Sequence, residues 1–431
     1  MKTCIIVGAG GRGKDAYAPI LARENLLRVV GVAEPDADRR HAFCETYGIA
    51  ANMAFDGWQS LFSQGRLADA VLICTQDRMH LAPTLAAIRC GYHILLEKPI
   101  SPLAEEIDTL EEALVGYDRV FMTGFVLRYT PFIRRIRALL DAGAIGDVMN
   151  MQLNENEGYW HHAHSYVRGQ WNNAESSSPL IVAKSCHDFD LMLYLLGRHC
   201  THIASYGTNS YFKAANAPGR VPARCTDGCA FAEGCKYNAV RQYTAGEGRY
   251  FVHKFGCGTD DASIIEALRT NPYGRCVYHC DNNVCDHQVA ALEFERGIDA
   301  VFTVSAFSQR NTRTVKLMGT EGEIGGCMED GELVLRRFAD GTTEHLTVTH
   351  DGTKHCGGDG GLMRRFAEAV NADERGADAR IFEAHRLTLE AERVRRQAQT
   401  SLGGTGARAG GGGDDDDGAF DDEDDDEDDD D

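Results

Sequence analysis

A predicted strand, a glycine-rich turn and a predicted helix near the N-terminus constrain the fold more than any other feature. Residues 4–7 form a short apolar run, and residues 14–23 follow the turn with a helical pattern. In such a turn the first glycine permits a tight bend, the second admits a pyrophosphate, and the third lets helix pack on strand. The pattern predicts a parallel, doubly wound sheet that binds a dinucleotide. The turn contains Gly8, Gly10, Gly11 and Gly13.

An acidic residue ends the next predicted strand, residues 27–33. Glu34 follows Gly13 by 34 − 13 = 21 residues. A carboxylate at this place accepts hydrogen bonds from ribose hydroxyls and repels a 2′-phosphate, which favours NAD. Arg39 and Arg40 come soon after and are candidates to hold a 2′-phosphate, so NADP stays open.

A lysine stands at the end of a later predicted strand, residues 92–96, in the sequence Glu97-Lys98-Pro99. Ligands bind outside the carboxyl ends of strands in open α/β sheets. We therefore expect Lys98 at the nicotinamide end of the cofactor, acting as a base or steadying a developing alkoxide. Pro99 would fix the turn, whereas a lysine that only reaches into solvent is the alternative.

Charge is concentrated at the C-terminus. The net charge of the 431 residues is −21, but residues 414–417 and 421–431 hold 15 acids, which leaves 65 − 15 = 50 acids against 44 bases elsewhere. Segment 401–431 is rich in glycine and acid, so we expect it to be disordered, serving solubility or docking. The balance of the rest gives no reason to expect nucleic acid or a membrane as partner.

The chain shows no apolar run of about 18 residues and no signal peptide pattern. We therefore expect a cytoplasmic protein whose 15 cysteines are mostly reduced. Residues 1–125 alternate strands with helices, as a Rossmann domain does. Residues 126–400 predict an α+β domain with an open, largely antiparallel sheet, interrupted by an insertion at 209–285. Its last helix, residues 382–399, is expected to pack back on the first domain.

Four motifs together resemble one family: the glycine turn, residues 75–80, Glu97-Lys98-Pro99, and Gly319-Thr320-Glu321-Gly322. On these the chain resembles the glucose–fructose oxidoreductase / inositol dehydrogenase / MocA (Gfo/Idh/MocA) family. The resemblance implies a substrate cleft between the two domains, sugar, cyclitol or polyol substrates, and homodimers or homotetramers built on the second sheet. It also places Lys98 beside the reacting carbon. The implied cofactor-binding residues are Gly8, Gly10, Gly11, Arg12, Gly13, Glu34, Arg39, Thr75, His80, Glu97 and Lys98.

The second family motif, Asp-x-x-x-His, is only half present. His187 matches, but the aspartate position holds Ala183. We interpret His187 as the general acid or base, oriented by some other acceptor and assisted by Lys98. Lys184 lies three residues before His187 and can share its helix face, as a second cation for an anionic or heavily hydroxylated substrate. A structural histidine and a surface lysine are the alternatives.

A polar, aromatic segment precedes that motif. Aromatic faces with hydrogen-bonding tips suit sugar rings, so we expect substrate contacts there, with ordinary packing or a metal on His161, His162 and His164 as alternatives. Arg128 after the fifth strand is a further candidate. The expected substrate-binding residues are Tyr159, His161, His164, Arg168, Trp171, Lys184 and Arg128.

The insertion is rich in cysteine. Cys225, Cys229 and Cys235 have spacings that suit a tetrahedral structural zinc, completed by Cys276 or Cys280. Free buried thiols and an iron–sulfur cluster are the alternatives.

These features predict an NAD(P)-dependent oxidoreductase acting on a carbohydrate or polyol. A second hypothesis keeps the cofactor bound and uses a transient keto sugar to eliminate a substituent, as a glycosidase or lyase. A third is a regulatory protein that senses NAD(P) without catalysis; the missing aspartate favours it and the retained Lys98 and His187 oppose it.

Overall fold

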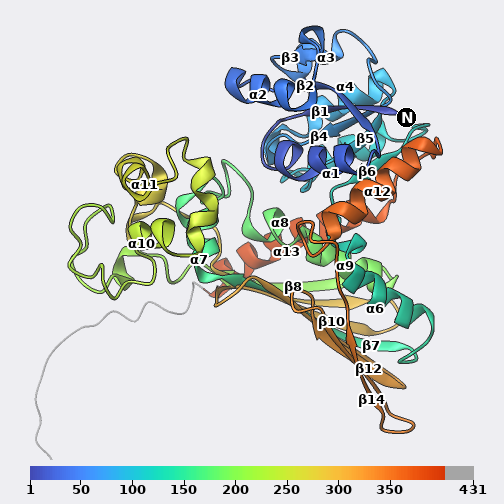
Figure 1. The fold of residues 1–431 in the computed structure, drawn as a ribbon. Coiled ribbons are helices and arrows are strands. Elements are labelled where there is room, and N and C mark those ends of the chain that lie inside the picture. Colours follow the sequence, from blue (N-terminus) through green and yellow to red (C-terminus); the bar gives the residue numbers. More distant parts are fainter. Residues whose placement is uncertain (403–431) are drawn as a thin grey trace, which may run out of the picture.

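Two sheets and a helical lobe make up the protein (Figure 1). The structure, a computed structural model, describes residues 1–402. The predicted disordered segment 401–431 therefore falls almost wholly outside the described residues. Within residues 1–402, every helix is too short or too polar to cross a bilayer.

The first sheet is parallel and confirms the predicted Rossmann domain. Its six strands run in the order β3-β2-β1-β4-β5-β6. Strands β4 and β5 are buried along their whole length, which explains their continuous apolar sequences. The order reverses between β1 and β4, so their carboxyl ends border a crevice suited to a ligand. The strands are β1 (Thr3–Val7), β2 (Arg28–Ala33), β3 (Ala54–Phe55), β4 (Ala70–Ile73), β5 (His93–Leu96) and β6 (Phe121–Thr123).

The helix predicted over residues 14–23 is divided into a wider turn and an α-helix. The break falls next to Pro19, which has no N–H to donate to a preceding carbonyl. The first domain's helical segments are η1 (Gly13–Tyr17), α1 (Ala18–Arg23), α2 (Ala37–Tyr47), η2 (Ala51–Met53), α3 (Trp58–Phe62), η3 (Asp77–Met79), α4 (Leu81–Cys90) and α5 (Ala104–Ala113).

The second sheet has eight strands in the order β14-β13-β12-β11-β7-β10-β9-β8. All neighbours are antiparallel except β7 and β10, which confirms a largely antiparallel open sheet. Arg296 and Gly297 both have positive φ in the tight turn between β9 and β10. The strands are β7 (Val148–Gly158), β8 (Cys200–Thr208), β9 (His287–Phe294), β10 (Ile298–Ser308), β11 (Thr312–Gly319), β12 (Gly322–Cys327), β13 (Glu332–Arg337) and β14 (Thr343–Thr347).

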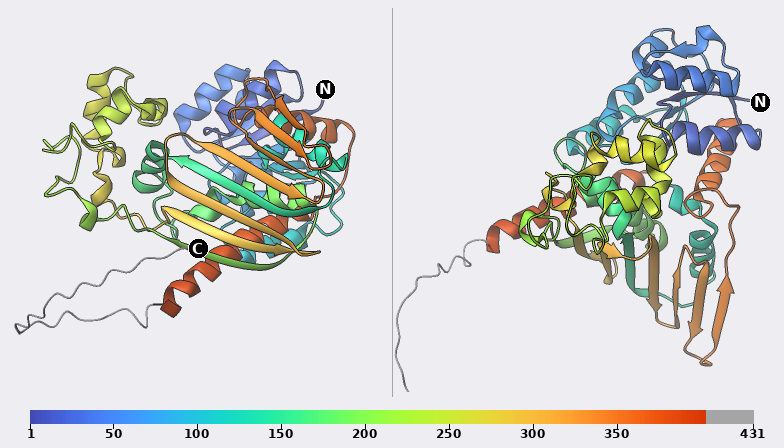
Figure 2. Two further views of the ribbon diagram at one scale, coloured as in Figure 1. Left: turned by 90° about the horizontal axis from the view of Figure 1, so that it is seen from below. Right: turned by 60° about the vertical axis from the view of Figure 1, so that its left-hand side comes forward.

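Helices cover one face of this sheet, whereas its other face is uncovered in the view from below (Figure 2). The last helix also reaches the first domain, as predicted. Phe382 stacks on Phe121 with ring centroids 6.4 Å apart, and His385 Nε2 accepts from Ile100 N at 2.8 Å. The helical segments are η4 (Val126–Tyr129), α6 (Pro131–Asp141), α7 (Tyr159–His162), η5 (Ala163–Arg168), α8 (Leu180–Ala183), α9 (Cys186–Leu196), α12 (Gly358–Asn371) and α13 (Arg380–Leu402).

The insertion forms a separate lobe of short helices, yellow-green in Figure 1. Two small apolar clusters hold it together, and the ring of Phe251 packs on α7 and η5. The lobe therefore stands beside the start of the second domain. Its helical segments are η6 (Ala214–Asn216), α10 (Ala239–Thr244), η7 (Glu247–Lys254), α11 (Asp261–Leu268), η8 (Pro272–Gly274) and η9 (Val277–His279).

Candidate active site

The glycine turn after β1 leaves one side open. Gly8 has a φ of +93°, and a Cβ atom there would lie 2.7 Å from the carbonyl oxygen of Cys74. A Cβ atom on Gly13 would lie 2.3 Å from the carbonyl oxygen of Gly8, so both positions require glycine. At Gly10 no atom lies within 4 Å of the corresponding point, and at Gly11 only the Asp15 carboxylate reaches 4.0 Å. This open face of the turn fits a pyrophosphate, so the turn suits a dinucleotide.

Glu34 is fixed beside that turn. It is 3% exposed, and its carboxylate accepts from Ala9 N at 2.8 Å, Asp36 N at 3.0 Å and Arg39 Nη2 at 2.8 Å. Arg40 donates to the Glu34 carbonyl oxygen at 2.6 Å. Both arginines that could have held a 2′-phosphate are therefore engaged by Glu34.

Arg12 ties the glycine turn to two distant carboxylates. Its Nε donates to Glu97 at 2.8 Å, and its two terminal nitrogens bind Asp359 of α12 at 3.0 and 2.9 Å. Burial acts to raise the pKa of Glu97, but Arg12 and a hydrogen bond from Tyr17 outweigh it and lower that pKa. The Glu97 carboxylate is therefore held ionised, and Arg12 joins both domains to the cofactor turn.

His80 supports the loops on which Lys98 stands. One ring nitrogen lies 2.6 Å from the carbonyl oxygen of Pro99, and the other lies 3.1 Å from that of Thr75. The Thr75 hydroxyl in turn donates to the carbonyl oxygen of Met79 at 2.9 Å. In the structure, His80 and Thr75 thus brace the backbone after β4 and β5.

Lys98 reaches across to the second domain. Its Nζ donates to the carbonyl oxygen of Ala183 in α8 at 2.8 Å. Ala183 occupies the position where the resemblance expects an aspartate to pair with the histidine at 187; its backbone oxygen holds Lys98 and does not replace that pair. The two domains therefore meet at this lysine.

His187, in the first turn of α9, is 5% exposed. Its ring centroid lies 5.9 Å from that of Phe125 and 6.1 Å from that of His355. Burial, together with the charges of Lys98 and Arg313, lowers the pKa of His187 well below 6.5. The imidazole is therefore neutral at pH 7 and able to accept a proton. The expected acceptor that orients it is absent from residues 1–402, since Nδ1 is buried there without a hydrogen-bond partner.

Lys184 belongs to a buried network of charges. Its Nζ lies 3.3 Å from Glu155 and 3.9 Å from Glu157, both on β7. Arg313 of β11 pairs with Glu155 and, at 2.8 Å, with Asp188. Burial raises the pKa of Asp188 to about 7, although Arg313 opposes the shift. Lys184 is therefore a paired cation rather than a free one.

Motif reasoning missed Glu155, Glu157 and Arg313. One signal was available in the alternation of β7, because Glu155 and Glu157 fall in register with the buried residues Met151 and Leu153. An acid at a buried position of a strand indicates a partner or a ligand. The partner itself comes from strand pairing, since Arg313 lies directly opposite Glu155.

Glu157 orients two histidines. Its carboxylate accepts from His161 Nδ1 at 2.6 Å and from His162 Nδ1 at 2.8 Å. Burial acts to raise the pKa of Glu157, but Lys184 and His162 outweigh it and lower that pKa well below 4.5. A carboxylate that fixes one ring nitrogen leaves Nε2 of His161 available for a proton or a ligand.

Two of the predicted substrate-binding residues, His164 and Arg168, instead contact the insertion. The ring of His164 lies between Phe251 and Tyr273, with centroids 3.9 and 4.5 Å away. Buried Arg168 donates to the carbonyl oxygens of Arg275 at 2.7 Å and Tyr237 at 2.6 Å. This placement favours a role for both side chains in holding the lobe.

The remaining candidates are spread over the domain border. Trp171 donates to Asp77 of the first domain at 3.2 Å. Arg128 binds Asp190 through two nitrogens at 2.6 and 2.5 Å. The ring of Tyr159 packs edge-on against Tyr237 inside the lobe. The structure brings Lys98, His187, Lys184 and His161 toward one region and leaves these three at its margins.

The loop before α12 has an unusual backbone conformation and places His355 near His187. His355 and Cys356 have φ of +53° and +50°, and Gly357 has +87°. Positive φ is uncommon for residues with a side chain and marks functional or tightly constrained sites. His355 Nδ1 lies 2.9 Å from Asp359, which also holds Arg12. No sequence motif indicated this residue.

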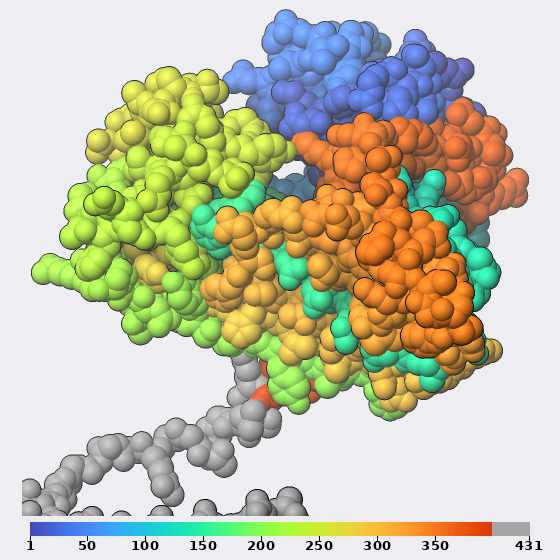
Figure 3. Space-filling view, turned by 60° about the horizontal axis from the view of Figure 1, so that its bottom comes forward, coloured from blue at the N-terminus to red at the C-terminus, as the bar shows by residue number. Residues whose placement is uncertain are grey.

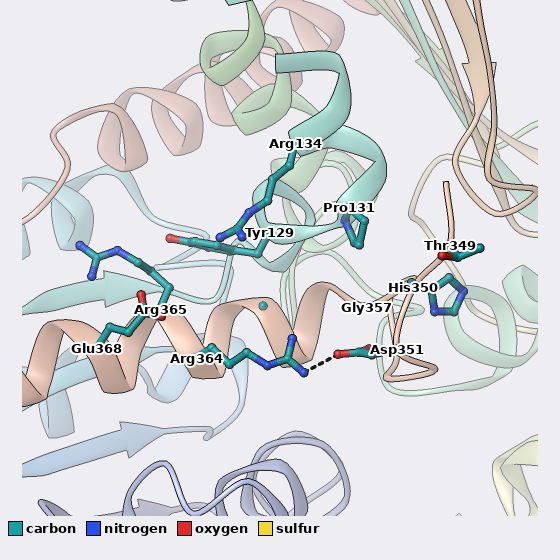
Figure 4. A pocket seen from close by; sticks show the side chains of 11 residues that line it. Tyr129, Pro131, Arg134, Thr349, His350, Asp351, Gly357, Arg364, Arg365 and Glu368 are labelled. Atoms are coloured by element: carbon teal, nitrogen blue, oxygen red, sulfur yellow. Dashed lines mark hydrogen bonds and ion pairs between the residues drawn. The ribbon is translucent and has the colours of Figure 1, made fainter. Parts of the chain in front are cut away.

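The space-filling view shows an opening between the first domain, the insertion and the segment near residue 350 (Figure 3). A different pocket, of about 390 Å³, lies between α12, the start of α6 and residues 349–357 (Figure 4). Arg364 and Asp351 pair across it at 2.6 Å, and Arg134 lies over the ring of Tyr129. That pocket contains neither Lys98 nor His187.

The predicted zinc site is not supported. Over residues 1–402, no group of three or more histidine, cysteine or acidic side chains is placed to hold a metal ion. Cys225, Cys229, Cys235 and Cys276 are free cysteines that line a narrow, largely apolar cavity with Phe231. The spacing brought the thiols into one loop region, but it does not determine where each sulfur points.

Comparisons with known proteins agree with this geometry. Residues 2–125 match a model described as an oxidoreductase family with an NAD-binding Rossmann fold, and residues 133–325 match the GFO/IDH/MocA C-terminal domain. YteT of Bacillus subtilis is 24% identical over 334 residues, which cover 75% of this chain and 76% of that protein.

Inositol 2-dehydrogenase 4 of Saccharopolyspora erythraea is 28% identical over 215 residues, 49% of this chain and 58% of that enzyme. The match thus spans little more than half of that enzyme's length. An oxidoreductase domain protein from Kribbella flavida has a similar fold, with a TM-score of 0.67 at 16% identity, covering 93% of this chain and 98% of that one.

Proposed function

The chain belongs to the Gfo/Idh/MocA family of oxidoreductases, and from this premise we propose that it transfers a hydride between NAD and a carbon bearing a hydroxyl group in a sugar, cyclitol or related polyol. One observation carries the proposal. Lys98 from the first domain and neutral His187 from the second converge near the open glycine turn, close enough for the lysine charge to act on the histidine.

The chain's own residues would manage the proton. NAD, when bound, would accept the hydride at the nicotinamide ring. His187 is neutral and takes the hydroxyl proton as the alkoxide develops. The Lys98 ammonium, held by the carbonyl oxygen of Ala183, stabilises that negative charge and returns to this anchor afterwards. Arg12 keeps Glu97 ionised beneath the lysine.

NAD rather than NADP is the proposed cofactor. The Glu34 carboxylate lies beside the turn and would accept from ribose hydroxyls while repelling a 2′-phosphate. The hydrogen bonds of Arg39 and Arg40 to Glu34 support this choice, because they withdraw both guanidinium groups from a phosphate.

We also propose a homo-oligomer built on the uncovered face of the second sheet. A sheet with one uncovered face and strands at both edges offers a broad surface to a second copy. Tyr206 of β8 and Met149 of β7, 59% and 48% exposed, are two of its large apolar side chains left in solvent. Sedimentation of the purified protein would give the assembly state, and a monomer would contradict this part.

The test of the activity is a direct assay. Purified protein is mixed with NAD and, separately, with myo-inositol, D-glucose and other polyols, and NADH is followed by absorbance. We expect NADH to form with at least one polyol and Lys98→Ala to slow its formation by about a hundredfold or more. Failure of the protein to bind NAD at all would overturn the proposal.

A measurement on the same purified protein separates the dehydrogenase, which completes a net oxidation, from the glycosidase or lyase, which oxidises its substrate only transiently. Nucleotide released on denaturation is measured per chain before any cofactor is added. Little released nucleotide with ready binding of added NAD favours the dissociating dehydrogenase proposed here. Close to one nucleotide per chain would favour the glycosidase or lyase that retains its cofactor. Binding without turnover of any substrate would favour the sensor.

A further inference from the structure

Lys254 and Lys354 approach each other between the insertion and the loop before α12. Lys254 ends η7 of the insertion, and its Nζ lies 5.1 Å from the ring centroid of Phe251. Lys354 belongs to the loop before α12, and its Nζ lies 5.8 Å from the ring centroid of Tyr250. Tyr250 and Phe251 are neighbours whose rings meet edge to face with centroids 5.2 Å apart, and we call this pair the aromatic platform. Each ammonium group lies over one of its two rings.

Neither lysine has a carboxylate within ion-pair distance among residues 1–402. This contrasts with Arg12, Lys184 and Arg313, each of which is paired. Loss of surrounding water lowers the pKa of Lys254, and the charge of Lys354 lowers it further, while Asp15 after the glycine turn acts in the opposite direction. The two cations repel each other, and an anion between them would relieve that repulsion.

The platform connects the lysines to the catalytic residues. The Phe251 ring lies 5.6 Å from that of His161, which Glu157 holds beside Lys184. Lys354 directly precedes His355, whose ring lies 6.1 Å from that of His187. The pair therefore lies where the insertion and the loop before α12 approach the rings of His161 and His187.

We propose that Lys254 and Lys354 bind an anionic substituent, a carboxylate or a phosphate, on the sugar or polyol that the site oxidises. The inference deepens the proposed function by naming the substrate class, and it rests on that function. The insertion then acts in specificity, because it supplies both one lysine and the aromatic platform. A substrate phosphate and a cofactor phosphate share this chemistry, so the test separates them.

Binding is measured by calorimetry on the protein saturated with NADH, which needs no turnover. The probes are D-glucose, D-glucuronate and D-glucose 6-phosphate, which share one ring and differ in charge. We expect at least one anionic probe to bind about tenfold more tightly than D-glucose, as two exposed ion pairs allow. The preference should disappear in the Lys254→Ala/Lys354→Ala variant and weaken at high salt.

Lys213→Ala is the matched control, because it removes one exposed charge from the same insertion and should preserve the preference. Equal affinity for charged and neutral probes, or no binding of either anionic probe, would overturn the inference. So would a preference that survives the double substitution. A double variant that instead loses affinity for NADH would assign the lysines to a cofactor phosphate. Failure of the proposed function appears separately, as absent NAD binding or turnover that Lys98→Ala leaves unchanged.

Discussion

The site has a cofactor half, around the ends of β1, β2 and β5, and a substrate half, around β7, α9 and β11. The two halves differ in how far apart in sequence their contacting residues lie. On the cofactor side, the functional residues stand at the turn after β1 and at the ends of β2 and β5, positions that the sequence predicts, and Asp359 of α12 joins them from far along the chain. On the substrate side, Arg313 of β11 pairs with Glu155 of β7 and Asp188 of α9, each more than a hundred residues away from it in sequence. The cofactor half thus places most of its residues at turns and strand ends that the sequence indicates, whereas the substrate half depends on which strands pair.

The difference also concerns charge. In the cofactor half a single cation, Arg12, pairs with two carboxylates, Glu97 and Asp359. In the substrate half Lys184 and Arg313 share Glu155 beneath the ligand site, while Lys254 and Lys354 remain unpaired between the insertion and the loop before α12. Among the described residues, Arg12 of the cofactor half is therefore paired before a ligand arrives, whereas Lys254 and Lys354 of the substrate half are not.

The largest effect should come from the residue that joins the halves. Lys98→Ala should reduce kcat by about 10²- to 10⁴-fold, because it removes the group that acts on the reacting oxygen. NAD affinity, measured by calorimetry, should change little. Lys98→Arg keeps a charge that does not release its proton, so retained activity in that variant would assign the lysine to charge stabilisation alone.

Arg12→Met tests whether the cofactor half depends on one cation. Removing the guanidinium leaves Glu97 and Asp359 buried without their partner, so the free energy of unfolding should fall by about 3–5 kcal/mol. Urea denaturation measures it. Arg393→Met is the control, since this exposed arginine pairs only with Glu390 and should cost ~1 kcal/mol or less. Equal losses in both variants would refute the assignment.

Glu34→Ala should change the choice of cofactor. A hydrogen bond to a charged group contributes about 1.5 kcal/mol or more, so NAD affinity should fall about tenfold. NADP affinity should rise, because Arg39 and Arg40 lose their partner and are free to meet a phosphate. Titration of each nucleotide against the variant measures this, with Glu45→Ala on the exposed side of α2 as control. Unchanged selectivity would remove Glu34 from the cofactor site.

The smallest effect is one of pH. Burial and neighbouring cations depress the pKa of His187, so the acid limb of kcat/KM should lie below pH 6.5 rather than at it. A depressed pKa also contributes stability that is present above the unfolded value, about 6.5, and is lost as pH falls toward the folded value. His187→Ala should remove this limb from the residual activity. A limb centred at pH 6.5 or above would contradict the neutral, buried imidazole.

Much of the first domain follows from sequence for a physical reason. Gly8 and Gly13 are required by contacts within the turn, and Glu34 is fixed by the end of β2, so residue type and spacing carry the information. The same holds for the alternation that predicted β7 and for the helix that packs back on the first domain.

The contacts of the substrate half could not be predicted from the sequence, because they depend on the register of paired strands and on the direction of each side chain. Arg313 meets Glu155 only through the pairing of β11 with β7, which the sequence does not specify. His355 reaches the site through a left-handed loop that lacks a motif. The cysteine spacing indicated proximity correctly, but the four thiols line a cavity and do not converge on an ion.

The hydrogen bond that anchors Lys98 to the carbonyl oxygen of Ala183 affects which amino-acid substitutions the protein tolerates. Because the contact at residue 183 comes from a carbonyl oxygen, the anchor does not depend on which side chain residue 183 carries. Any residue that preserves α8 and its buried packing would leave the anchor in place. The side chain at position 183 can therefore change without removing this hydrogen bond between the domains.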